Sequence, residues 1–340
     1  MIPSDTALPF DDIRALVRSF PAADAAAAES VRLRDATLTK PPGSLGRLEE
    51  IAVWLASWQR RTPPRVDRPL VAIFAGNHGV AAHGVSAYPA EVTAQMVENF
   101  AAGGAAINQI CGANDIGLKV FDLALDLPTA DIASEAALTE KACAGTMAFG
   151  MESLVGGVDL LCVGEMGIGN TTVAAAVCCG LFGGAPEDWI GPGTGVDQDG
   201  MARKRDAVAT GMAVHAGHLD QPLEVLRRLG GRELAAIAGA IIAARHESVP
   251  VIVDGFVASA AAAVIGQMGE GTLDHCLFAH VSAEPGHRRL LERLGKQPLL
   301  DLGMRLGEGT GAALAATIVR TAARTHAGMA TFGEAGVSQT

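Results

Sequence analysis

A single carboxylate lies in a glycine-rich stretch near the end of the chain. Glu308 stands between Gly307 and Gly309 within residues 302–313, directly before an Ala- and Leu-rich run that is typical of a helix. Glycines let the backbone approach a ligand closely, and the N-terminus of a helix favours anionic groups. These surroundings differ from those of a solvated surface charge. We therefore interpret Glu308 as a proton acceptor held against a substrate.

A second glycine-rich segment, residues 163–172, follows a predicted strand and opens a predicted helix. It contains Gly167 and Gly169 and ends in threonines. Free backbone N–H groups beside Thr hydroxyls can cradle a phosphate. The alternative is a tight turn whose glycines serve packing only, because the segment matches neither the Walker pattern nor the dinucleotide fingerprint. Its position between strand and helix favours the phosphate.

A third loop, residues 191–197, contains Gly193, Thr194 and Gly195, and the basic run 203–205 follows it. Basic residues on a helix face are usually solvated. In this acidic chain, a basic run soon after a glycine loop can also neutralise a phosphate. The sequence leaves both interpretations open.

Histidines and a further polar turn complete the candidates. Residues 280–287 follow a predicted strand and offer hydroxyl and backbone donors, with helix capping as the alternative role for Glu284 and His287. The remaining candidates lack the spacing and the carboxylate of a zinc-binding helix, and no cysteine lies suitably near. We expect these to be hydrogen-bonding histidines, with neither a metal nor another cofactor: His78, His83, His215 and His218.

Two classes of enzyme are disfavoured. A serine hydrolase would need a Gly-x-Ser-x-Gly elbow, which the chain lacks. A phosphoribosyltransferase that uses a pyrophosphate-activated sugar would carry an acidic pair after a hydrophobic strand, whereas residues 251–255 hold Asp254 alone.

Composition restricts the partners and the compartment. The 340 residues are 49% hydrophobic and carry a net charge of −11, which argues against nucleic acid or an anionic membrane as partner. The six cysteines show no CxxC spacing, so we expect buried free thiols in a reducing compartment. Residues 1–20 do not resemble a signal peptide, and no apolar run is long enough for a membrane span. We expect a cytoplasmic protein.

Strand and helix patterns alternate along the centre of the chain. Five short runs are almost continuously apolar, as in strands covered on both faces. This alternation predicts an α/β fold with a doubly wound parallel sheet, in which ligands bind beyond the carboxyl ends of the strands. The predicted strands are 70–75, 118–123, 158–163, 249–253 and 276–280, and the predicted helices between them are 91–100, 105–110, 132–154, 171–181, 201–215, 232–245 and 259–268.

The two flanks read as helical. Residues 9–20, 22–40 and 45–60 have helical character, and so do residues 310–324 beyond the last strand. We expect a small helical domain built from both chain ends. The predicted divisions are 1–62 for its N-terminal part, 63–303 for the sheet domain, 304–332 for the returning loop and helix, and 333–340 for a mobile tail.

Taken together, these segments resemble the nicotinate-nucleotide–dimethylbenzimidazole phosphoribosyltransferases, a family of cobalamin lower-ligand synthesis. The resemblance runs in order over about residues 40–316, and its last motif is highly specific. The matching pieces are residues 40–49, 77–80, 91–93, 164–167 with 170–172, Lys204, 254–256, 280–284 and 305–309.

The resemblance implies a Rossmann-like parallel sheet and a homodimer, in which residues 40–47 serve either their own or the partner's site. It also implies a reaction between nicotinate mononucleotide and 5,6-dimethylbenzimidazole that gives α-ribazole 5′-phosphate and nicotinate. No metal is required. Two alternatives remain: a non-catalytic nucleotide or base sensor, and a nicotinamide-dependent oxidoreductase. The oxidoreductase lacks its fingerprint after the first predicted strand, at residues 74–79.

The same resemblance assigns roles to individual residues. Glu308 resembles the general base that takes the benzimidazole proton, and Glu165 is the candidate carboxylate near the ribose. Around the base, some relatives carry Ser and Gln where this chain has Tyr88 and Met96, and Leu306 is assigned to the same pocket. The residues that resemble those around the phosphate and nicotinate are Gly167, Asn170, Thr171, Lys204 and Ser282.

Overall fold

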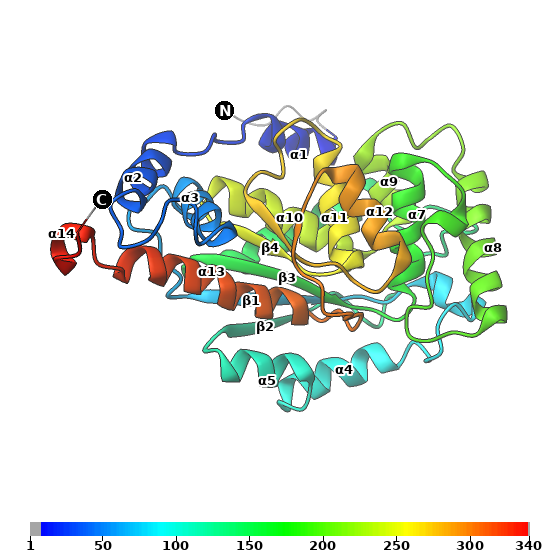
Figure 1. Ribbon diagram of the computed structural model, residues 1–340. Coiled ribbons are helices and arrows are strands. Elements are labelled where there is room, and N and C mark those ends of the chain that lie inside the picture. Colours follow the sequence, from blue (N-terminus) through cyan, green and yellow to red (C-terminus); the bar gives the residue numbers. More distant parts are fainter. Residues whose placement is uncertain (1–7, 339–340) are drawn as a thin grey trace.

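A six-stranded sheet forms the centre of the protein, which is described here by a computed structural model covering residues 8–338 (Figure 1). All strands are parallel, in the order β2-β1-β3-β4-β5-β6. The predicted doubly wound α/β sheet is therefore confirmed. The strands are β1 Pro69–Ala75, β2 Gly117–Asp122, β3 Leu160–Met166, β4 Val251–Val253, β5 Cys276–His280 and β6 Pro298–Leu300.

The chain reverses its direction of travel across the sheet between β1 and β3. From β1 it moves outward to β2, then returns to place β3 on the other side of β1 and continues to β6. Loops from neighbouring strands diverge at such a switch point and leave a crevice at the carboxyl ends. This topology positions the functional site.

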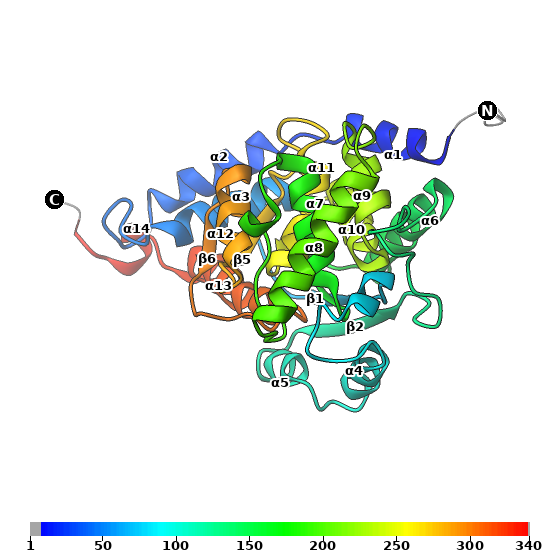
Figure 2. The same cartoon turned by 90° about the vertical axis from the view of Figure 1, so that its right-hand side faces the viewer.

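Helices cover both faces of the sheet (Figure 2). Alternate residues of β1 and β3 point to opposite faces and join two separate apolar clusters, because strand side chains alternate. One face is covered mainly by α6 Glu140–Met151, α7 Asn170–Phe182, α10 Arg232–His246 and α11 Phe256–Gly266, and the other by α3 Arg47–Gln59, α4 Val92–Ala101, α5 Ala106–Ala113 and α13 Thr310–Gly328. The outer helices are α8 Gln198–Val214, α9 Pro222–Leu229 and α12 Pro285–Leu294.

The predicted secondary structure differs from the observed one at several places, among them helix α9, which was not predicted, and α2 Ala25–Asp35, which ends at Asp35 instead of reaching residue 40. Residues 132–154 were expected as one helix, but α6 begins only at Glu140, because the Thr139 side chain accepts the N–H of Ala142 at 3.1 Å and caps it. The preceding residues form an irregular segment held by buried Ile132 and Leu138. The sixth strand, β6, was not predicted, since three half-buried residues give no pattern.

Helices from both ends of the chain lie together at one side of the sheet (Figure 1). These are α2 Ala25–Asp35, α3, the end of α13 and α14 Phe332–Ala335. The N–H of Phe332 donates to the carbonyl of Thr37 at 3.0 Å and ties the two ends to each other. Helix α1 Pro9–Arg18 packs instead on α6. Of the predicted mobile tail, 333–335 belong to α14 and 339–340 lie outside the described residues.

Within residues 8–338, no helix has the length and apolar character needed to cross a membrane. All six cysteines are buried. Burial raises the pKa of each thiol, which keeps the thiols protonated and unreactive.

Candidate active site

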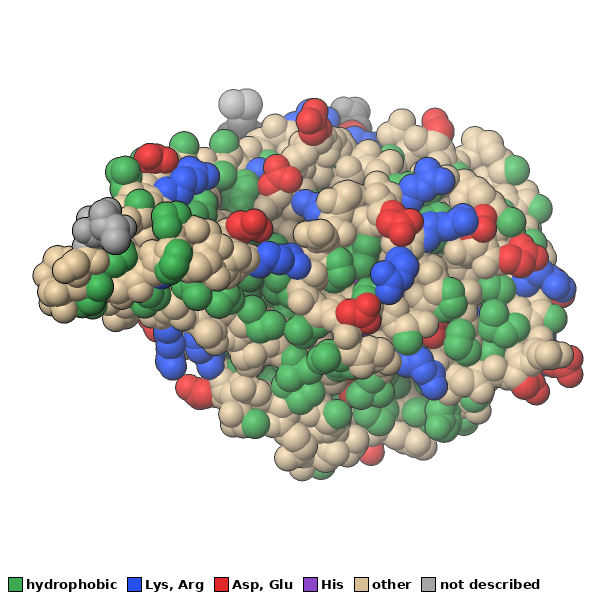
Figure 3. Space-filling model, viewed as in Figure 1, with side chains coloured by type: hydrophobic (Ala, Val, Ile, Leu, Met, Phe, Trp, Pro, Cys, Tyr) green, Lys and Arg blue, Asp and Glu red, His purple; other side chains and the backbone are tan. Residues whose placement is uncertain are grey.

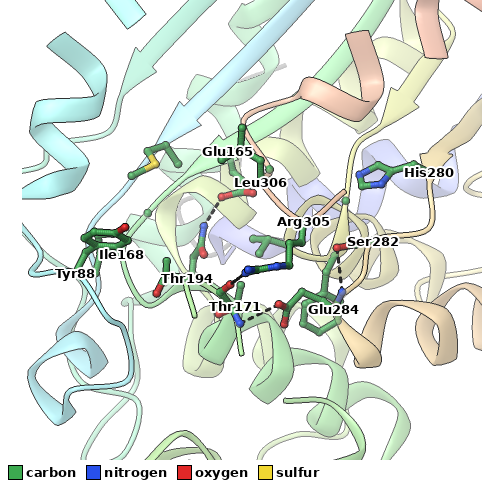
Figure 4. Close-up of a pocket in the computed structure, with 18 residues that line it drawn as sticks. Tyr88, Glu165, Ile168, Thr171, Thr194, His280, Ser282, Glu284, Arg305 and Leu306 are labelled. Carbon is green, nitrogen blue, oxygen red and sulfur yellow. Dashed lines mark hydrogen bonds between the residues drawn. The ribbon is translucent and has the colours of Figure 1, made fainter. Parts of the chain in front are cut away.

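A cavity of about 460 Å³ opens at the carboxyl ends of the strands. Its wall combines the end of β3, the loops that follow β3, β4 and β5, the glycine loop before α8 and residues 305–307. Tyr88 and His280 lie at opposite sides, with Glu165 and Arg305 between them (Figure 4). The predicted convergence of strand-end loops therefore exists.

Glu165 is the first carboxylate of the site and belongs to the end of β3. It is 8% exposed, and the amide of Asn170 donates to its Oε2. Burial raises its pKa well above the ordinary value, and Asp254 and Glu233 raise it further by charge repulsion. A Cβ at Gly307 would lie 2.6 Å from Oε1. Only glycine allows this approach.

Glu308 is the second carboxylate. It is not among the residues that line the cavity, but it directly follows Gly307, which does line it. It has a φ of +61°, in the left-handed region that non-glycine residues seldom occupy. Within the described residues, nothing donates a hydrogen bond to its carboxyl group. Burial raises its pKa to about 7, and the charge of Asp254 adds to this effect. A carboxyl group with this pKa can exchange a proton near neutral pH.

The loop after β3 presents a helix N-terminus to the cavity. Gly167, Asn170 and Thr171 line the wall. Gly169 is the N-cap of α7 with a φ of +91° and has no side chain to cap the helix. The N–H of Asn170 donates to the carbonyl of Gly167 at 3.2 Å and that of Thr172 to the carbonyl of Gly169 at 3.0 Å, which leaves the N–H of Thr171 for a ligand. Gly169 itself does not line the cavity.

The glycine loop before α8 is clamped at Gly193. Its N–H donates to Glu284 Oε1 at 2.8 Å, and its carbonyl accepts from Arg305 Nη1 at 2.6 Å. Gly193 and Thr194 line the cavity, whereas Gly195 does not. The Thr194 hydroxyl accepts the N–H of Ala87 at 3.1 Å and so joins the loop to the segment that carries Tyr88.

Lys204 supports this loop from behind and is absent from the cavity wall. It is 1% exposed, and its Nζ donates to the carbonyl of Gly191 at 2.8 Å and to Thr171 Oγ1 at 3.0 Å. Burial lowers its pKa to about 8, while Glu284 opposes the shift. The basic run near the third loop thus contributes one buried ammonium group that holds two loops together.

The three residues assigned to the base pocket separate into two groups. Tyr88 and Leu306 line the cavity and are 55% and 56% exposed. Met96 is half-buried and packs against the apolar cluster on the α13 face of the sheet. The structure therefore does not place Met96 on the cavity wall, because its helix turns that side chain inward.

Arg305 and Glu284 were missed as site residues by the sequence analysis. Arg305 is the only Lys or Arg on the wall of the described cavity. Arg305 could have been predicted as a site residue because it belongs to the specific motif 305–309. Glu284 is the N-cap of α12, but its side chain makes no cap hydrogen bond and reaches the loop at Gly193 instead. Ser282 lies on the wall as expected.

Two of the four candidate histidines, His83 and His215, make side-chain hydrogen bonds within the described residues, and His78 lies close to a carboxylate without making one. His83 Nε2 lies 2.7 Å from Asp131 Oδ2, and His215 Nε2 lies 3.2 Å from the carbonyl of Ile132. His78 Nε2 lies 2.7 Å from Glu233 Oε1, with both side chains fully buried. Among the described residues, no group of three or more His, Cys, Asp or Glu has the arrangement of a metal site.

Comparisons with known proteins agree with this geometry. A family profile described as phosphoribosyltransferase matches residues 20–337. A curated nicotinate-nucleotide–dimethylbenzimidazole phosphoribosyltransferase of Brucella anthropi is 66% identical over 98% of this chain and 99% of its own length. The protein of that name from Sinorhizobium medicae is 67% identical over the same shares.

Solved structures agree as well. The crystal structure of CobT from Thermus thermophilus is 45% identical, with a TM-score of 0.86 over 93% of this chain and 100% of the other. A second structure of a protein from that organism, titled with the phosphoribosyltransferase name, is 44% identical with the same TM-score. The strand order, the cavity at the carboxyl ends and these likenesses lead to one conclusion: the chain belongs to the nicotinate-nucleotide–dimethylbenzimidazole phosphoribosyltransferase family.

Proposed function

We propose that this protein transfers the phosphoribosyl group of nicotinate mononucleotide to 5,6-dimethylbenzimidazole and releases nicotinate and α-ribazole 5′-phosphate. The names of its close relatives specify both substrates. The observation that carries the proposal is Glu308, a carboxyl group whose pKa burial raises to about 7 at the edge of a cavity large enough for small-molecule substrates.

Glu308 acts as the general base. One nitrogen of the benzimidazole forms a bond to the anomeric carbon, and the N–H proton of the ring passes to the Glu308 carboxylate. A base with a pKa near the working pH has a substantial ionised fraction and is still strong enough to take the proton. Because no donor among residues 8–338 binds its carboxyl group, the ionised form is free to accept this proton.

Glu165 stabilises positive charge on the ribose. The bond from the anomeric carbon to the pyridinium nitrogen breaks, and nicotinate leaves with a neutral ring that needs no acid. The sugar then has oxocarbenium character, which a carboxylate stabilises. Burial alone favours the protonated form of Glu165, since it raises the pKa of this group. The cationic pyridinium of the bound nucleotide has the opposite effect and favours the ionised form.

The anionic groups of the nucleotide bind opposite these carboxylates. The N–H of Thr171 at the start of α7 and the guanidinium of Arg305 provide donors on the wall. Lys204 acts indirectly, through Thr171 and Gly191. The proposed phosphate and nicotinate set comprises Gly167, Gly169, Asn170, Thr171, Gly193, Thr194, Gly195, Lys204 and Ser282, together with Arg305.

The planar base lies against Tyr88 and Leu306, which line the cavity and remain exposed. Met96 does not belong to this wall, because it packs against the apolar cluster on the α13 face of the sheet. Apolar walls discriminate poorly between similar flat rings, so we expect several benzimidazoles to be accepted.

The working enzyme is a cytoplasmic homodimer. Hydrophobic side chains gather over α4, α5 and α13 on the face shown in Figure 3, as expected of a surface that a second copy covers. Residues 40–47 then serve the partner's site. Arg47 donates to the carbonyls of Pro298 and Gln297, at the amino end of β6, whereas the cavity opens at the carboxyl ends. The segment therefore lies at the wrong end to reach its own cavity.

One incubation tests the proposed reaction. The purified protein is mixed with nicotinate mononucleotide and 5,6-dimethylbenzimidazole, and the products are identified by mass. We expect equimolar nicotinate and α-ribazole 5′-phosphate. Tight binding of either substrate without release of nicotinate would contradict the proposal and favour a sensor.

A further inference from the structure

Asp254 is a fully buried carboxylate that the reaction above leaves without a role. It directly follows β4 and is 0% exposed. Its Oδ1 accepts the N–H of Ala312 at 2.8 Å, and its Oδ2 accepts the N–H of Gly309 at 3.2 Å. Gly309, the N-cap of α13, has no side chain to cap the helix. A residue from another element therefore caps α13.

This cap acts on the residue next to it. Glu308 has a φ of +61°, a conformation that costs a non-glycine residue energy and persists only where the surroundings hold it. Its own N–H donates to the carbonyl of Glu165 at 3.2 Å, and the next N–H along the chain, that of Gly309, goes to Asp254. The backbone of Glu308 is thus held on both sides.

The surrounding packing leaves no room for the loop to shift. A Cβ at Gly311 would lie 2.2 Å from His280 Cδ2 and 3.0 Å from Asp254 Oδ1. A Cβ at Gly164, on β3, would lie 2.4 Å from the nitrogen of Gly309. Glycine at both positions lets Asp254 and β3 approach the loop this closely.

Charged and titratable groups face Asp254 from three sides. His280 Nε2, at the end of β5, lies 3.9 Å from Oδ1. Burial raises the pKa of Asp254, whereas the amide donors and His280 favour its anion. Glu308 in the loop, and Glu165 and Cys162 on β3, experience its negative charge, which raises the pKa of all three groups.

We propose that Asp254 is the positioning residue of the general base: it fixes the backbone that presents Glu308, and its negative charge keeps Glu308 a strong proton acceptor. This inference rests on the proposed role of Glu308. It assigns two separable effects to one side chain, one geometric and one electrostatic.

The test compares Asp254→Asn with a matched control, Asp159→Asn. Asp159 also accepts two backbone N–H groups, from Asp67 at 2.7 Å and Arg68 at 3.0 Å, but it lies at the amino end of β3. For each variant, kcat and kcat/KM are measured from about pH 5 to 9, where kcat/KM reports the pKa values of the free enzyme. The same substrates serve all variants, so their own ionisations cancel in the comparison.

In Asp254→Asn, we expect kcat to fall by about ten- to a hundredfold, because the base is displaced. We also expect the acid limb of kcat/KM to move to lower pH by at least about half a unit, because a like charge is lost. In Asp159→Asn, kcat and the position of the acid limb should both stay as in the parent enzyme. If Asp254→Asn does not fold, Asp254→Ser, which keeps one acceptor and no charge, carries the same prediction.

The outcomes separate this inference from the proposed function. An unmoved acid limb in Asp254→Asn, with Glu308→Gln inactive, would overturn the role of Asp254 and leave the general base intact. An active Glu308→Gln would overturn the general base itself. A merely structural role of Asp254 predicts lower activity or stability with the acid limb unmoved.

Discussion

At the scale of single residues, Glu165 and Glu308 have the same side chain but different environments, and these suit them to different chemical roles. Both are buried, and burial raises the pKa of each. Glu165 is bound by the Asn170 amide and faces the cavity. The carboxyl group of Glu308 accepts no hydrogen bond from residues 8–338, and Glu308 directly follows Gly307 of the cavity wall. The first suits stabilisation of a cation that arrives with substrate, and the second suits proton transfer.

Glu308 should lower the stability of the folded protein as the pH rises. Its pKa in the fold is about 7, above the ordinary value of 4.5, so the folded state holds this proton more tightly than the unfolded state. Stability therefore falls between these two values as pH increases, by up to about 3 kcal/mol. Glu308→Gln avoids this loss. Its Tm advantage over the parent protein should be larger at about pH 8 than at about pH 5, and an equal difference at both would contradict the pKa shift.

Lys204 should affect binding of the nucleotide rather than chemistry. Lys204→Met removes the donor that joins Gly191 to Thr171. We expect KM for nicotinate mononucleotide to rise about tenfold or more, with a smaller change in kcat. Because the pKa of Lys204 is lowered to about 8, KM of the parent enzyme should also rise above this pH as the charge is lost. Arg205→Met, on the exposed side of the same helix, is the matched control, and an equal rise there would argue against this role.

The sequence predicted those site residues whose role follows from their residue type and from their neighbours in the chain. Glu165, Thr194 and Ser282 lie on the cavity wall as expected, and Glu308 lies at its edge. It did not reveal that Glu284 and Lys204 meet at one loop, because these contacts join residues far apart in the chain. It also did not show which way Met96 points, since a helix position alone leaves the facing side open.

At the scale of elements, the site depends on a close approach between β3 and the loop before α13. Gly164 and Gly309 lie back to back, and a Cβ on Gly164 would be 2.5 Å from the Cα of Gly309. The end of one strand and the start of one helix thus meet without an intervening side chain. This contact brings Glu308 next to Glu165.

Gly164→Ala should therefore damage both stability and catalysis. The added methyl group must displace the loop, which costs about 1–3 kcal/mol in an overpacked core and moves Glu308 away from the substrate. Gly145→Ala is the control, because a Cβ there meets nothing within 4 Å in the middle of α6. Gly164→Ala should lower both the Tm and the turnover, whereas Gly145→Ala should leave the Tm unchanged or raise it. Normal turnover in Gly164→Ala would show that this contact is dispensable.

Periodicity predicted the elements with long apolar runs and failed for short or irregular ones. The buried strands β1 and β3 appear as expected because both faces are covered. The strand β6 and the segment before α6 are held by tertiary contacts, and such contacts produce no periodic pattern of apolar residues in the sequence. Sequence therefore indicated where the crevice lies but not its full border.

At the scale of the whole molecule, the two chain ends form a helical group at the amino ends of the strands, while the cavity opens at the carboxyl ends. Trp54 of α3 donates to the carbonyl of Asp274, just before β5, which places α3 at that amino end. A single copy therefore leaves residues 40–47 remote from its own cavity. In a closed dimer, the same segment can border the cavity of the partner.

Mixed dimers test this arrangement. Ser44 is exposed at the tip of the segment, so Ser44→Arg should block a partner's cavity without unfolding the chain. Co-expression of Ser44→Arg with Glu308→Gln should restore about a quarter of the parent activity, because half of the dimers contain one intact composite site. Light scattering should give twice the chain mass of 34.8 kDa. Absence of restored activity would indicate that each chain serves its own site.

The most direct test of the account is the turnover of Glu308→Gln with nicotinate mononucleotide and 5,6-dimethylbenzimidazole. The substitution keeps the size of the side chain but removes its negative charge and its ability to accept the proton. We predict that α-ribazole 5′-phosphate formation falls by about a hundredfold or more while calorimetry still detects binding of the nucleotide. Turnover close to that of the parent enzyme would contradict the role of Glu308 as the base.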